Sequence, residues 1–170
     1  MDVFDLLLQN LKTLFDVREV VNGKVDMQKS LYFMKEFGYA IPFRFRWSKL
    51  GPYSHELANI LEHLTVQGYL NYTGQYDVNE KYFRFVEPHI TSEIKNFFYN
   101  LENICNKNNY NEIDFIECAA SLHFIYKYTS TKTKEKTFKK LAMLKPERMP
   151  KFTPLVNSAW GFLKDNGLIV

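Results

Sequence analysis

Hydrophobic residues recur at helical spacing along most of this chain, and only one segment before Pro88 replaces that spacing with strict alternation. Residues 41–47 alternate apolar and polar side chains, with Phe and Trp on one face and two Arg on the other. This pattern predicts a strand with one buried face. A chain with a mixed first half and a helical second half is expected to fold as a mostly helical α+β protein.

Three helices and a hairpin are predicted around that strand. The helical spacing covers residues 2–16, 24–37 and 54–67, and Gly38 and Gly68 favour the ends of the second and third helices. Residues 69–72 and 81–86 are strand-like runs joined across Gly74, which predicts that they pair. The order helix, helix, strand, helix, hairpin is that of a winged helix.

Only helices are predicted after Pro88. Their expected ranges are 91–105, 112–127, 132–143 and 153–166, with Thr153 as the cap of the last helix and Gly167 at its end. The chain of 170 residues has no repeat or linker, and 46% of it is hydrophobic. We therefore expect a single domain, residues 1–170, in which a winged-helix lobe (1–88) packs on a helical lobe (89–170).

The location of the protein is predicted from its apolar runs and its cysteines. No apolar run reaches the roughly 18 residues that span a bilayer, and the first residues are acidic where a secretory signal would be basic. Cys105 and Cys118 form neither a disulfide framework nor a zinc-binding spacing. These observations favour a cytoplasmic protein.

Several short motifs resemble the YwgA-like and Panacea antitoxin proteins. The matching segments are residues 27–33 (MQKSLYF), 51–57 (GPYSHEL), 68–70 (GYL), 116–123 (IECAASLH) and 144–146 (LKP). Met27 stands where the family usually has Leu, and Leu50 where Tyr is common. The chain is also similar to the C-terminal domain of antitoxins to DNA-ADP-ribosylating toxins. The resemblance implies a winged-helix protein that binds another protein, often a toxin, and it implies no catalytic residue.

Motifs of catalysis are absent. The chain has no glycine-rich phosphate loop, no nucleophile elbow and no His-Glu-x-x-His. His55 and His63 are eight positions apart on a predicted helix, so they do not lie one above the other as metal ligands would. Cys118 and His123 share a predicted apolar helix, which favours a small core residue over a nucleophile at Cys118. We expect no enzyme activity, no metal and no cofactor.

One set of polar residues has two interpretations. Gln28, Lys29 and Tyr32 share a helix face, because they are three or four positions apart. In the first, Gln28 and Tyr32 hydrogen-bond the turn at residues 51–53 (GPY) and fasten the helix to the loop. Alternatively, Gln28, Lys29, Tyr32, Tyr53 and Ser54 line a groove in which a partner protein docks, extended by exposed Tyr39, Tyr72 and Tyr76.

The uneven distribution of charge along the chain suggests an alternative function, the binding of nucleic acid. The net charge is only +3, but residues 127–151 hold nine Lys or Arg against two Glu. The predicted third helix carries Glu56 and Glu62 and no Lys or Arg, which disfavours its insertion into a DNA groove. The leading prediction is therefore a protein-binding module, antitoxin-like or defence-related, and the alternative is a DNA-binding regulator. Its candidate contacts to nucleic acid or an acidic partner are Arg44, Arg46, Lys49, Lys81, Arg84, Lys132, Lys134, Lys136, Lys139 and Lys140.

Overall fold

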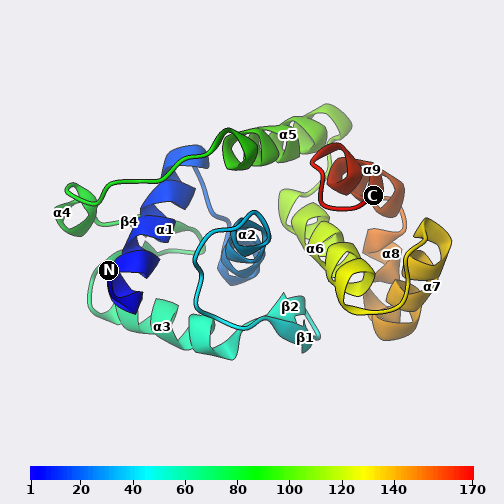
Figure 1. Cartoon of the computed structure of the whole chain (residues 1–170), viewed down its shortest axis with the longest axis horizontal. Helices are drawn as coiled ribbons and strands as arrows, with labels where there is room; N and C mark the ends of the chain where they lie inside the picture. The colour runs from blue at the N-terminus through cyan, green and yellow to red at the C-terminus, as the bar shows by residue number, and fades with distance from the viewer.

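The computed structural model describes all 170 residues and is mostly helical, with two small antiparallel hairpins (Figure 1). This is the α+β, mostly helical class predicted from the sequence. The elements are α1 (Val3–Val17), α2 (Lys24–Glu36), β1 (Arg46–Ser48), β2 (Gly51–Tyr53), α3 (His55–Val66), β3 (Leu70–Tyr72), β4 (Tyr76–Val78), α4 (Glu80–Phe83), α5 (Ser92–Asn108), α6 (Glu112–Tyr128), α7 (Lys134–Leu144), the 3-10 turn η1 (Pro146–Arg148), α8 (Met149–Phe152) and α9 (Val156–Asp165).

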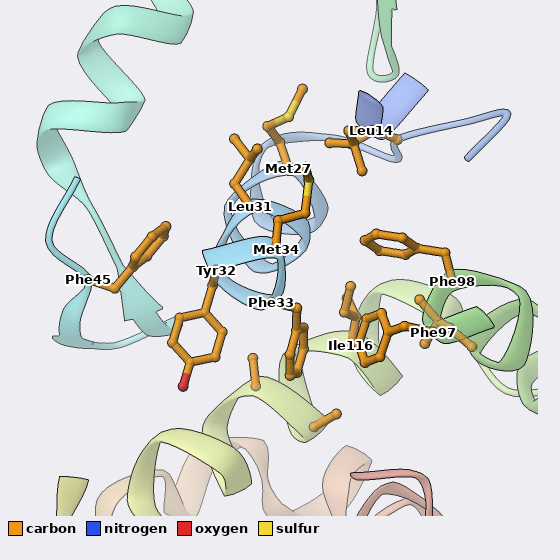
Figure 2. Close-up of a cluster of buried hydrophobic side chains, with 14 of the residues drawn as sticks. Leu14, Met27, Leu31, Tyr32, Phe33, Met34, Phe45, Phe97, Phe98 and Ile116 are labelled. Atoms are coloured by element: carbon orange, nitrogen blue, oxygen red, sulfur yellow. The ribbon is translucent and has the colours of Figure 1, made fainter. Parts of the chain in front are cut away.

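Helix α2 is the centre of the first half. Nine of its consecutive residues, Asp26 to Met34, are buried, so the helix is covered on every side. In Figure 2 its side chains reach toward α1 at Leu14, toward α5 at Phe97 and toward the segment before β1 at Phe45. The Phe33 and Phe97 ring centroids are 4.8 Å apart. A helix buried all round acts as the axis on which the other elements pack.

Helix α6 has the same role in the second half. Ten of its residues are buried, and it packs against α2, α5, α7, α8, α9 and β2. Buried hydrophobic residues from both halves form one connected cluster of 42 members. None of the helices combines the length and apolar character that crossing a bilayer requires.

The strands differ from the predicted ones. Only Arg46 and Trp47 of residues 41–47 are in strand β1, which pairs with β2, although the predicted alternation of burial holds throughout the segment. The hairpin after α3 joins β3 to β4, not to residues 81–86. Residues 80–83 form α4 instead, because the Asn79 side chain accepts a hydrogen bond from the Lys81 N–H and starts a helical turn. The two hairpins belong to separate sheets.

Helix boundaries follow the predicted signals except near the C-terminus. Ser54 caps α3 by accepting a hydrogen bond from the Leu57 N–H, as expected. The prediction of one helix over 153–166 capped by Thr153 is wrong. The chain forms the short α8 first, Thr153 continues its last turn with helical dihedral angles, and α9 begins only at Val156.

Candidate partner-binding groove

Two of the polar residues predicted to line a groove, Gln28 and Lys29, fasten α2 to the end of the β1–β2 hairpin, and Gln28 also lines a depression together with Tyr53. Gln28 Nε2 donates to the Ser54 carbonyl at 2.8 Å, and the Ser54 N–H donates back to Gln28 Oε1 at 3.0 Å. Both residues are buried. These hydrogen bonds fit the packing interpretation, although they reach the residue directly after the predicted turn, and they leave both residues with their polar groups already occupied.

Lys29 is a buried amine beneath the same turn. Its side chain is 0% exposed, and Nζ donates to the Pro52 carbonyl at 2.7 Å. Burial lowers the pKa of Lys29 to about 7, while the nearby carboxylate of Glu117 opposes that shift and Lys145 adds to it.

Tyr32 bonds a different element from the one predicted. Its hydroxyl lies 2.7 Å from His123 Nδ1 on α6, not against the turn. Burial raises the pKa of Tyr32 well above its usual range and lowers the pKa of His123 to about 4. Tyr32 and His123 therefore form a neutral buried pair that joins α2 to α6.

Only some of the tyrosines predicted to extend the partner-binding surface lie on it. Tyr53 and Tyr72 line a depression of about 220 Å³ between α2, α3 and the second hairpin, and Tyr76 borders it although it is buried. Tyr39 is also buried, with its hydroxyl donating to the His89 carbonyl, so it does not extend this surface as predicted.

A second group of charged residues lies under the hairpin, with Lys145 and Glu117 buried and Arg148 and Asp114 partly exposed, and the sequence analysis did not single it out. Lys145 is 1% exposed, with Nζ 3.6 Å from Glu117 Oε1. Arg148 donates to Glu117 Oε2 at 2.6 Å and to Asp114 at 3.0 Å. The Ser121 hydroxyl, close to Gly51, has no hydrogen-bond partner. A Glu inside the apolar run 115–120 was the available signal, because unpaired charges are rarely buried.

A further hollow, bordered by two arginines without ion-pair partners, lies between α2, the segment leading into β1, and the end of α6. It has a volume of about 530 Å³, and we call it the aromatic groove. Its lining residues are Tyr32, Lys35, Glu36, Arg44, Phe45, Arg46, Trp47, Phe124 and Tyr128. Five of these nine are aromatic, so the groove offers a ring-lined surface.

The rings of the aromatic groove contact one another. Tyr32 and Phe45 are buried and packed edge to face, with centroids 5.5 Å apart. Phe124 lies 5.9 Å from Trp47 and 4.7 Å from Tyr128, which is 55% exposed. Phe124 and Tyr128 are four positions apart on α6, a spacing that is visible in the sequence but that the sequence analysis did not single out.

The free charge of the groove is positive. The guanidinium groups of Arg44 and Arg46 are exposed and take part in no ion pair or side-chain hydrogen bond. Glu36 is already neutralised, since Lys127 pairs with it and the Tyr128 hydroxyl donates to it at 3.0 Å. Lys35 is also engaged, because Nζ donates to the Phe43 carbonyl at 2.5 Å.

The other predicted basic contacts lie on separate surfaces. Lys49 is exposed in the turn of the β1–β2 hairpin, whereas Lys81 and Arg84 belong to the α4 region at the opposite end of the first half (Figure 1). Lys132 follows α6 and donates to the Tyr126 carbonyl. Lys134, Lys136, Lys139 and Lys140 are on α7 in the second half. The fold does not gather these residues into one basic face.

The structure does not bring together side chains that could form a catalytic or metal-binding site. Cys118 is buried, and burial raises the pKa of its thiol, which disfavours the nucleophilic thiolate. No set of three His, Cys, Asp or Glu residues is placed to hold a metal ion. Comparison of the chain with protein-family models, with curated proteins and with solved structures finds no match.

Proposed function

We propose that this protein is a non-enzymatic interaction module, antitoxin-like or defence-related, that binds a partner protein in the aromatic groove. The main support for this proposal is that five aromatic rings and two exposed, unpaired arginines line the same hollow. Trp, Tyr and Arg are the residues that most often carry the binding energy of protein interfaces.

The lining defines the chemistry of the partner segment. The rings of Trp47, Phe124 and Tyr128 favour an apolar side chain as the anchor, because burying it removes apolar surface from water. Arg44 and Arg46 favour carboxylates beside that anchor, since a guanidinium binds a carboxylate through paired hydrogen bonds. The proposed partner is therefore an acidic segment with at least one large apolar residue.

A DNA-binding regulator is the alternative outcome. Glu56 and Glu62 are exposed on α3, where they would repel phosphates from the helix that usually enters the major groove. The basic residues outside the groove are dispersed over α4 and α7. Duplex binding would need several of these surfaces at once.

Reversal of the groove charge tests the proposal. Tagged protein is purified from its native host after nuclease treatment, and bound proteins are quantified by mass spectrometry. The double variant R44E/R46E should lose a stoichiometric partner by at least about tenfold, because two attractive charges become repulsive. The matched control K81E/R84E makes the same charge change on α4 and should retain the partner.

The same two variants separate the alternatives. A partner retained by R44E/R46E would remove the aromatic groove as the binding site. Nucleic acid that co-purifies without nuclease and is lost in both double variants would support the DNA-binding regulator instead. Thermal unfolding of each variant serves as the folding control, and little change is expected because all four side chains are exposed.

A further inference from the structure

The backbone beside the aromatic groove has unused hydrogen-bonding groups. Residues 43–45 reach β1 without forming a helix or a turn, and none of their three N–H groups donates to a protein acceptor. Backbone donors are nearly always paired when they are shielded from water. This run of the chain therefore presents an open strand edge.

Pairing within the β1–β2 hairpin shows which side is open. Trp47 is opposite Pro52, which has no N–H, so this is the non-hydrogen-bonded pair of the ladder. The N–H and carbonyl of Trp47 then face away from β2, and with a period of two those of Phe45 and Phe43 face the same way. Lys35, which lines the groove, donates to the Phe43 carbonyl and marks this side as the groove side. That carbonyl is occupied, which leaves the Phe43 N–H and both backbone groups of Phe45 and Trp47 for pairing with a partner.

We propose that the partner segment binds as an added β-strand along residues 43–47, with acidic and apolar residues in alternation. Addition of a strand to an open edge is a common mode of peptide recognition. Residues opposite each other on paired strands share a face. Acidic side chains would then lie beside Arg44 and Arg46, and apolar ones beside Phe45 and Trp47. This inference rests on the proposed function, and it specifies how the partner segment is held.

A peptide with a modified backbone tests strand addition apart from side-chain binding. The probe is the acetylated hexapeptide (Glu-Leu)3, labelled for fluorescence polarisation. One version carries N-methyl groups on the three Leu amides and the other on the three Glu amides. A strand pairs through one edge only, so one version should bind at least about tenfold more weakly and the other within about threefold of the parent.

Each other result overturns strand addition. Equal affinities of all three peptides would show that only side chains are recognised, and an equal loss in both methylated versions would show a general effect on peptide conformation. No saturable binding of the parent peptide would also overturn it. If the parent peptide binds and R44E/R46E abolishes that binding while methylation has no effect, the proposed function stands and strand addition fails. Saturable binding of an oligothymidine strand instead of the peptide would point to nucleic acid.

Discussion

Two ionisable side chains at the centre of the molecule, Lys29 and His123, are held where the neutral form is favoured. Lys29 is wholly buried and His123 is 2% exposed. The groups that face Lys29 are Glu117, Lys145 and the Tyr53 ring, and those near His123 are Tyr32, Glu36 and Lys127. Both pKa values are lowered in the folded protein, so stability is expected to depend on pH through each group.

Lys29 predicts a gain in stability on the alkaline side. Its pKa is about 7 when folded and near 10.5 when unfolded, so between these values the unfolded chain binds the extra proton. The free energy of unfolding should therefore rise by about 2 kcal/mol between pH 7 and pH 9 through this group.

The measurement is urea unfolding of wild type and Lys29→Met across that pH range. The two thiols shift in the opposite direction and contribute equally to both proteins, whereas Lys145 shifts in the same direction as Lys29 and is coupled to it. The difference between the two pH slopes reports Lys29 together with its interaction with Lys145. Parallel curves would contradict the prediction, whatever the stability of the variant at pH 7.

His123 predicts a loss of stability on the acid side. Its pKa is about 4 when folded and 6.5 when unfolded, so the unfolded chain gains a proton first as the pH falls through this window. The free energy of unfolding should fall by about 3 kcal/mol between pH 6.5 and pH 4 through this group. His123→Gln keeps a polar side chain near the Tyr32 hydroxyl and should reduce this pH slope in the same unfolding experiment. An unchanged slope would count against the buried neutral imidazole.

The sequence predicted the contacts of single residues only where helical spacing places the residues close together. The sequence placed Gln28, Lys29 and Tyr32 on neighbouring positions of one helix. Gln28 bonds Ser54, directly after the predicted turn, whereas the side chain that bonds the turn itself is Lys29, for which no such bond was predicted. The partner of Tyr32 is 91 positions away on α6, and no local pattern could assign it. Only the packing of α2 against α6 brings the two side chains together.

At the scale of elements, the β1–β2 hairpin depends on one glycine. Gly51 has a φ of +79°, and a Cβ there would lie 2.5 Å from the Ser121 hydroxyl of α6. The hairpin can sit against α6 only because this position has no side chain.

Gly51→Ala should therefore destabilise the protein more than a glycine change without such a contact. Gly74→Ala is the matched control, because its φ is +86° and no atom lies within 4 Å of a Cβ. We expect about 1 kcal/mol for the control and about 3 kcal/mol for Gly51→Ala, measured by urea unfolding. Adding Ser121→Ala to Gly51→Ala should recover part of the difference. Equal costs for the two glycine changes would show that α6 does not crowd the hairpin.

Elements were predicted well where one signal dominated and poorly where two signals competed. The helix predicted over 112–127 is α6, within one residue at its end. Residues 81–86 combine aromatic and β-branched side chains with a preceding Asn, and the capping by Asn79 prevailed over strand propensity. The alternation in 41–47 predicted the buried face correctly but not the pairing, which needs a neighbouring strand that only Arg46 to Ser48 possess.

At the scale of the whole molecule, the two halves share their core. The residues of α2 that are covered by α5 and α6 include Phe33 and Tyr32, and β2 also lies against α6. Residues 1–88 alone would expose these rings and the amine of Lys29.

A chain cut after residue 88 should therefore fail to fold by itself. We expect it to show no cooperative thermal transition and no near-ultraviolet circular dichroism signal, whereas the full chain shows both. Co-expression of residues 89–170 should restore the signal if the two parts associate. A sharp transition for residues 1–88 alone would show that the first half has a sufficient core of its own.

The open edge at residues 43–47 has one more consequence, because an edge that can accept a foreign strand can also accept its own copy. If two molecules met there, Arg44 and Arg46 of one would come close to the same cations of the other, and like charges at that distance repel. The arginines that select an acidic guest thus also discourage fibril-like stacking of the protein on itself while the edge is empty.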